Sequence, residues 1–222
     1  GSPDGVEQLT NIETLQFSDI TIGLSDYVSI TKLKDAVITL FAEAGKGDQL
    51  KKALNTTTSV SLGNANLLAL ASRLTAGSAA DWPTITVANS SDLNSLNGVY
   101  AKSTSTIYLN QGWLAKATSA DAVGVLLEEL GHHFETLLKT TDSPGDEGEY
   151  FSLLVRGLTP NQSELSRILA ENDATTVTIN GVSLNVESAE GTAANDNLIG
   201  TDGADALFGY GGNDTLSGGR GD

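Results

Sequence analysis

The C-terminal end of the chain repeats every nine residues, and this period restricts the possible folds more than any other feature. From Gly191 three units follow one another, residues 191–199, 200–208 and 209–217, and a fourth begins at Gly218. In each complete unit an aspartate precedes a leucine by two positions; the aspartates are Asp196, Asp205 and Asp214. Glycines allow tight turns, carboxylates bind hard cations, and leucines in phase can form a thin stacked core. The period therefore predicts stacked, cation-binding turns.

This pattern resembles the G-G-x-G-x-D-x-U-x nonapeptide of RTX calcium-binding proteins. The resemblance implies the start of a parallel β-roll, with calcium as a cofactor. It assigns calcium binding to the three aspartates and to four glycines, Gly200, Gly209, Gly211 and Gly212. Residues 4–19 resemble the strand segment that commonly follows an RTX block. The resemblance thus implies that the globular part lies between two calcium-binding stretches of a larger secreted protein.

The charge of the chain excludes some classes of partner. Its 222 residues contain 28 acidic and 12 basic side chains, a net charge of −16. Such a surface repels nucleic acid and anionic membranes, so neither is an expected partner. Cysteine is absent, which rules out disulfides and thiolate metal sites. Without a long apolar run or a signal peptide, the sequence predicts no membrane insertion and, by the RTX resemblance, export through a type I route.

Periodicity between the two flanks predicts an α+β fold, mostly helical with a small sheet. Apolar residues recur at helical spacing over 32–44, 62–74 and 118–139, and further helices are expected over 146–156 and 160–171. Alternating β-branched residues predict strands over 82–87, 98–102 and 106–110, and a hairpin over 176–186 turns at Asn180-Gly181. The expected organisation is a strand segment (1–22), a globular domain (23–172), a hairpin connector (173–190) and calcium repeats (191–222).

The helix predicted over 118–139 carries the candidate chemistry. It contains both histidines of the chain, His132 and His133, in the run Glu128-Glu129-Leu130-Gly131-His132-His133. Residues four apart share a helix face, so Glu128 and His132 project together and His133 lies away from them. The run resembles the H-E-x-x-H helix of zincin metallopeptidases, with Glu128 in place of the first histidine. That resemblance implies Glu128 and His132 as metal ligands and Glu129 as general base.

A third ligand is expected from the segment that follows. Asp146-Glu147-Gly148-Glu149 resembles the second helix of gluzincins, which donates a glutamate to zinc; either Glu147 or Glu149 fits. Two carboxylates and one imidazole can hold zinc, but this oxygen-rich set also suits another divalent metal. In zincins an edge strand before the active-site helix binds the substrate, and residues 99–110 resemble it. Tyr108, Tyr150 and His133 are three candidates for oxyanion stabilisation.

Three other interpretations of the motif remain open at the level of sequence. The helix could present a solvated charged face, or belong to a di-iron carboxylate bundle, which needs a second E-x-x-H motif. It could also belong to an inactive protease-like module for calcium-dependent adhesion or spacing. The main hypothesis is a secreted metal-dependent peptidase that acts on a protein or peptide, including its own parent chain, in response to calcium.

Overall fold

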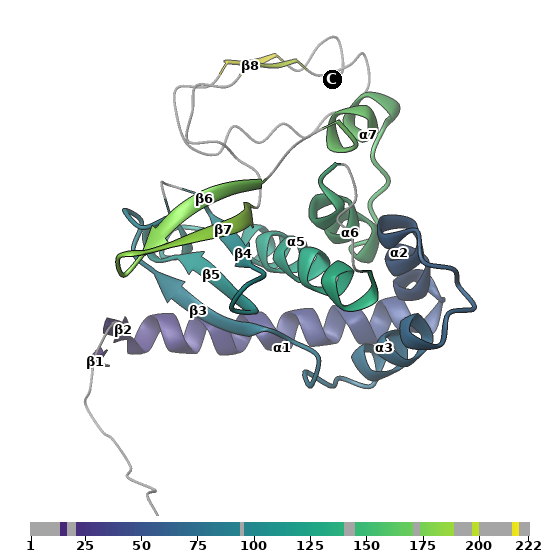
Figure 1. The fold of residues 1–222 in the computed structure, drawn as a ribbon, viewed down its shortest axis with the longest axis horizontal. Helices are drawn as coiled ribbons and strands as arrows, with labels where there is room; N and C mark the ends of the chain where they lie inside the picture. Colours follow the sequence, from purple (N-terminus) through teal and green to yellow (C-terminus); the bar gives the residue numbers. More distant parts are fainter. Residues whose placement is uncertain are drawn as a thin grey trace, which may run out of the picture.

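The globular part combines a helical layer with one mixed sheet. The computed structural model describes residues 14–16, 21–93, 96–139, 145–170, 174–188, 197–199 and 215–217. Its helices are α1 (Leu24–Lys46), α2 (Gln49–Thr58), α3 (Ala65–Thr75), α4 (Gln111–Leu114), α5 (Ser119–Leu138), α6 (Glu147–Val155) and α7 (Gln162–Ile168). Its strands are β1 (Thr14–Gln16), β2 (Thr21–Gly23), β3 (Thr84–Ala88), β4 (Gly98–Ala101), β5 (Thr106–Asn110), β6 (Ala174–Ile179), β7 (Val182–Ser188), β8 (Asn197–Ile199) and β9 (Thr215–Ser217). This mixture confirms the α+β class (Figure 1).

The main sheet has five strands in the order β3-β5-β4-β7-β6. Strand β3 runs parallel to β5, and the other neighbouring pairs are antiparallel. The hairpin predicted around Asn180-Gly181 is confirmed as β6 and β7, which extend the sheet of the globular part. The expectation that residues 99–110 form an edge strand is wrong: β4 and β5 are internal, and β3 and β6 lie at the edges. Pairing of β4 with β7 joins residues 87 and 89 positions apart, Tyr100 with Glu187 and Val99 with Ser188, which local patterns cannot reveal.

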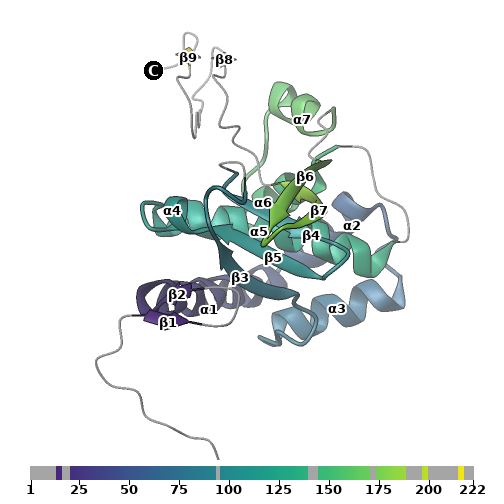
Figure 2. The ribbon, with the colours of Figure 1, turned by 60° about the vertical axis from the view of Figure 1, so that its left-hand side comes forward.

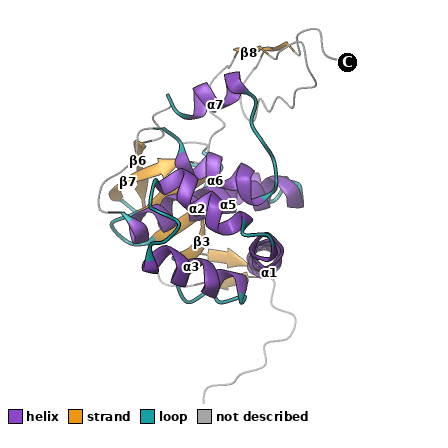
Figure 3. Ribbon diagram, turned by 90° about the vertical axis from the view of Figure 1, so that its right-hand side faces the viewer, coloured by secondary structure: helices purple, strands orange, loops and turns teal. Residues whose placement is uncertain are grey.

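Helices α1, α2, α3, α5 and α6 pack on one side of this sheet, whereas α7 lies apart from it beside α6, as Figures 1 and 3 show. The central helix α5 begins with a capping box, in which Thr118 and Asp121 exchange hydrogen bonds. Its apolar residues share one core with those of α1, α2, α3 and α6 and with the inward side chains of β4 and β5. Phe41, Phe134 and Phe151 meet at this core with ring centroids 5.8–6.2 Å apart. Helix α2, which was not predicted as a separate helix, contributes Leu50 and Leu54, both fully buried.

A smaller core lies on the other face of the sheet. Along β4 the side chains alternate: Val99 and Ala101 belong to the small core, whereas Tyr100 belongs to the helix-facing one. Val186 of β7 also lies in the small core. Successive residues of a strand point to opposite faces, so Glu187, the next residue, points toward the helices. Helix α5 lies on one side of the sheet (Figure 2), so only side chains on that face of the sheet can reach it.

Helices α5 and α6 approach closely at two glycines. A Cβ on Gly131 would lie 2.9 Å from the Cα of Gly148 and 2.9 Å from the Cβ of Phe151. A Cβ on Gly148 would overlap Nε2 of His132 and would lie 2.7 Å from the carbonyl oxygen of Glu128. Only residues without a side chain fit at this crossing. It brings the start of α6 directly against the residues of the E-E-x-x-H motif.

Short strand pairs are described in both flanks. Strands β1 and β2 are antiparallel, and β8 and β9 are parallel, with Asn197 opposite Thr215. These partners are 18 residues apart, two periods of the nine-residue repeat. Among the described residues, no helix is both long and apolar enough to cross a membrane.

Candidate functional site

The motif residues of α5 face the interior of the protein. Glu128, Glu129 and His132 have exposed fractions of 6%, 0% and 1%. The interpretation as a solvated helix face is therefore wrong, because a solvated glutamate would keep most of its surface in water. Glu129 lies under the start of β4, where a Cβ on Gly98 would come within 3.1 Å of its Oε1. The glycine at position 98 allows this close approach of strand and helix.

His132 lies between two carboxylates that come from different elements. Its Nδ1 is 3.3 Å from Oε2 of Glu187 on β7, and its Nε2 is 3.6 Å from Oδ1 of Asp146. Asp146 is fully buried and caps α6, since its Oδ1 accepts a hydrogen bond of 2.7 Å from the backbone N–H of Glu149. We call His132, Asp146 and Glu187 the His132 cluster. Neither carboxylate was among the predicted site residues.

The two candidate glutamates of α6 have different surroundings. Glu147 follows Asp146 at the start of the helix and is buried, with 8% of its surface exposed. Glu149 accepts hydrogen bonds from Nη2 of Arg167 on α7, at 2.6 and 2.7 Å to its two oxygens. The guanidinium occupies both oxygens of Glu149, so this carboxylate already has a cationic partner. Glu149 is therefore held toward α7, whereas Glu147 is buried beside Asp146.

His133 has a separate hydrogen-bond network. Its Nε2 is 2.7 Å from the carbonyl oxygen of Asp81, which only accepts, so Nε2 carries the proton. Its Nδ1 is 3.0 Å from the hydroxyl of Tyr100, which then donates to the ring. Burial lowers the pKa of His133 and raises the pKa of Tyr100. With both nitrogens engaged, His133 is a structural residue of the core and does not point at the motif carboxylates.

The remaining oxyanion candidates differ in position. Tyr108 packs against the small core on the face of the sheet opposite the helices, so its assignment near the motif is wrong. Successive residues of a strand point to opposite faces of the sheet. Ile107 and Leu109 belong to the helix-facing core, so Tyr108, between them, points away from the helices. Tyr150 lies on α6 and is partly buried. Tyr100, which was not predicted, reaches the helix layer from β4, opposite Glu187.

The donor types at the motif fit a divalent metal. Imidazole and carboxylate are both zinc ligands, and carboxylates also bind manganese or calcium. Gly148 packs directly against the ring of His132, where a Cβ would overlap Nε2. In the part of the chain that the structure describes, however, no three carboxylate or imidazole groups converge on one point at metal-binding distance. The residues therefore match a metal site in chemical type, without forming a closed coordination set.

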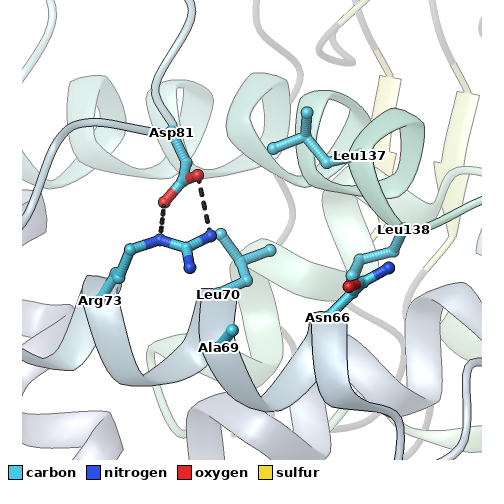
Figure 4. A pocket seen from close by; sticks show the side chains of 7 residues that line it. All are labelled: Asn66, Ala69, Leu70, Arg73, Asp81, Leu137 and Leu138. Atoms are coloured by element: carbon cyan, nitrogen blue, oxygen red, sulfur yellow. Dashed lines mark hydrogen bonds and ion pairs between the residues drawn. The ribbon is translucent and has the colours of Figure 1, made fainter.

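A pocket of about 220 Å³ lies between α3 and the C-terminal end of α5. Its wall includes Arg73 and Asp81, which are joined by two hydrogen bonds of 2.6 and 2.9 Å (Figure 4). None of Glu128, Glu129, His132 and Glu147 lines this pocket. The carbonyl of Asp81 that binds His133 connects the pocket wall to the core. The pocket is thus separate from the candidate metal ligands.

The predicted calcium ligands lie outside the described residues. They are Asp196, Asp205, Asp214, Gly200, Gly209, Gly211 and Gly212. Within this region the structure describes only β8 and β9, and the 18-residue offset between them is compatible with one turn of a roll for every two repeats.

Comparison with known proteins identifies this region alone. The family model of the RTX calcium-binding nonapeptide repeat, which spans four copies of the repeat, matches residues 190–222. No curated protein and no solved structure was found to match the chain. The α+β globular part thus stands without a matching relative, and residues 190–222 are RTX calcium-binding repeats.

Proposed function

We propose that the globular part is a metal-dependent peptidase of a secreted RTX protein. The metal, zinc or another divalent transition metal, would be held by Glu128, His132 and Glu147, and Glu129 would act as general base. Calcium would be bound by the repeats of residues 190–222. Export would follow the signal-peptide-independent type I route that is typical of proteins with such repeats.

One observation carries this proposal: the motif of α5 is buried together with the acidic start of α6. Glu128, Glu129, His132, Asp146 and Glu147 each have less than 9% of their surface exposed. Burying carboxylates is costly unless hydrogen bonds, cations or metals compensate for the lost hydration. Acidic residues brought to one helix crossing around a single imidazole favour a cation at that crossing. The glycines at 131 and 148 allow this arrangement.

The chain's own residues would then have distinct roles. A bound divalent metal supplies a Lewis acid that polarises a peptide carbonyl and increases the acidity of water. Glu129, which follows Glu128 on the helix, would accept a proton from the attacking water and return it to the leaving amine. Asp146 and Glu187 would orient His132.

A second candidate function is a non-catalytic module for calcium-dependent adhesion or spacing. Two observations favour it: the motif side chains are covered by neighbouring elements, and the described donor groups do not converge into a metal site. In that case the buried carboxylates and His132 would serve the packing of α5 against α6 and β7. The two candidates differ in whether the purified protein binds a transition metal and cleaves peptides.

The test compares Glu129→Gln with wild type in metal content and in cleavage of peptides and of the chain itself. The expected result is one equivalent of transition metal in both proteins and loss of cleavage in the variant. Glu135→Gln is the matched control, because Glu135 is a buried glutamate of the same helix that pairs with Lys139, at 2.9 Å. Absence of a transition metal, or equal cleavage by Glu129→Gln and wild type, would reject the peptidase and leave the adhesion or spacing module.

Self-processing adds a dependence on calcium. If the repeats must bind calcium for the globular part to act, cleavage of the parent chain starts when calcium is added to the calcium-free protein. Equal rates of cleavage with calcium and with a calcium chelator would contradict this part of the proposal.

A further inference from the structure

Strand β6 forms an open edge of the main sheet. It pairs with β7 on one side, and among the described residues no strand pairs with its other side (Figure 1). The opposite edge, β3, differs because helix α1 lies beside it. The turn of the hairpin also stands free, since no atom lies within 4 Å of a Cβ placed on Gly181. One row of backbone donors and acceptors on β6 is therefore available to another strand.

The turn of the hairpin fixes which backbone groups face that edge. The turn residues Asn180-Gly181 have φ values of 51° and 78°, as in a type I′ turn. Such a turn has a hydrogen bond between its outer residues, here Ile179 and Val182. Bonded and non-bonded pairs alternate along an antiparallel ladder. Every second residue from Ile179 backwards therefore bonds to β7, and the N–H and C=O groups of Thr176 and Thr178 face the open edge.

Strand β6 carries none of the features by which proteins usually block such an edge. Those features are prolines, lysines, other charged side chains and bulges. Residues 174–186 contain no proline and no charged side chain, and β6 pairs with β7 without a bulge. All residues of β6 except Ala174 are β-branched, which suits them to strand pairing. The composition of β6 therefore favours pairing with a further strand.

The occupant that fits this edge is the same strand of a second copy. Two identical strands in antiparallel pairing are related by a two-fold axis, so the outward donors of each copy meet the outward acceptors of the other. The chain has a net charge of −16, and two such molecules repel each other over most of their surfaces. Contact through the uncharged residues 174–179 keeps carboxylates out of the strand pair.

We propose that two copies of the chain associate by antiparallel pairing of their β6 strands, which joins their five-stranded sheets into one. The backbone groups of Thr176 and Thr178 form the new hydrogen bonds, and the exposed side chains of these threonines lie beside those of the second copy. One strand pair buries less than the roughly 800 Å² per partner of a standard stable interface, so the dimer forms at high protein concentration. The association requires neither calcium nor peptidase activity.

Sedimentation equilibrium of the full chain, with a calcium chelator present, measures the association. Between about 1 μM and about 1 mM protein, the weight-average mass should rise from 23.0 kDa toward twice that value. Added salt should strengthen the association, because it screens the repulsion between the acidic copies.

Amide hydrogen exchange locates the contact. The amides of Thr176 and Thr178 should exchange quickly in dilute protein and become protected at high concentration. The amide of Val177, which faces β7, should be protected at both concentrations and serves as the internal reference.

Three variants of one residue test the edge. Thr176→Pro removes an outward N–H and leaves the bonds between β6 and β7 in place, so it should remain monomeric. Thr176→Val is the matched control, because it keeps the N–H and a β-branched side chain, and it should associate like wild type. Thr176→Glu brings like charges together in the dimer and should weaken the association by about tenfold, an effect that salt partly reverses.

Each outcome supports or overturns the dimer. A wild type that stays monomeric at the highest concentration overturns it and leaves the edge to another occupant. Association that persists in Thr176→Pro, or that leaves the amides of Thr176 and Thr178 unprotected, also overturns it, because a different surface then makes the contact. If circular dichroism shows that Thr176→Pro is unfolded, Thr176→Glu decides. Cleavage is not measured, so the result is independent of the proposed function.

Discussion

Substitution of Gly148 by alanine tests the close crossing of α5 and α6 on which the candidate site depends. The added Cβ would overlap Nε2 of His132 and lie 2.7 Å from the carbonyl oxygen of Glu128. A backbone oxygen in the middle of α5 cannot move without shifting the helix, and His132 lies between Asp146 and Glu187. Overpacking of this kind costs about 1–3 kcal/mol in the free energy of unfolding. Alanine is also a better helix former than glycine by about 1 kcal/mol, so a net loss must come from the clash.

Chemical denaturation of wild type, Gly148→Ala and Gly47→Ala measures this effect. Gly47 is the matched control, since no atom lies within 4 Å of a Cβ placed there and its φ lies outside the left-handed region. We expect Gly47→Ala to be within about 0.5 kcal/mol of wild type. The thermal midpoint of Gly148→Ala should fall by about 2–4 °C for each kcal/mol lost. Equal stability of the two variants, with unchanged NMR signals of the His132 imidazole, would refute the close packing of α6 against the motif.

Three further perturbations have defined outcomes. Tyr100→Phe removes the hydroxyl that donates to His133 and should cost about 1–3 kcal/mol of unfolding free energy. Because burial raises the pKa of Tyr100, the folded state keeps this proton above pH 10, where the unfolded state releases it. The contribution of the Tyr100 hydroxyl to the free energy of unfolding is therefore complete below about pH 10 and is lost as the pH rises. In a pH titration followed by tyrosinate absorbance, the variant should lack one tyrosine ionisation at high pH. Thr118→Ala deletes the N-cap of α5 and should cost about 0.5–2 kcal/mol by denaturant titration, and equal stability would contradict the capping role. Arg73→Ala breaks the pair with Asp81. Because the side chain of Arg73 is 46% exposed, the free energy of unfolding should fall by no more than about 1 kcal/mol. A larger loss would indicate that the pair supports the pocket.

Local sequence patterns predicted most elements because their causes are local. The capping box at Thr118, the 3.6-residue periodicity of α5 and the Asn180-Gly181 turn are set by neighbouring residues. Helix α2 was not predicted as a separate helix, since its sequence Gln-Leu-Lys-Lys-Ala-Leu-Asn-Thr-Thr-Thr is polar and ends in β-branched threonines. Leu50 and Leu54 form that helix by packing into the core, a tertiary effect that outweighs weak propensity.

The sequence by itself determined the calcium repeats, the α+β class and the face shared by Glu128 and His132. All three follow from sequence periods of nine, two or 3.6 residues, which can be recognised in the order of neighbouring residues. Only the tertiary structure decided that Glu149 is engaged by Arg167 and that Asp146 and Glu187 flank His132. The register of β7 on β4 and the glycine crossing of α5 and α6 join residues distant in sequence. Such contacts depend on the packing of whole elements, and no local period contains them.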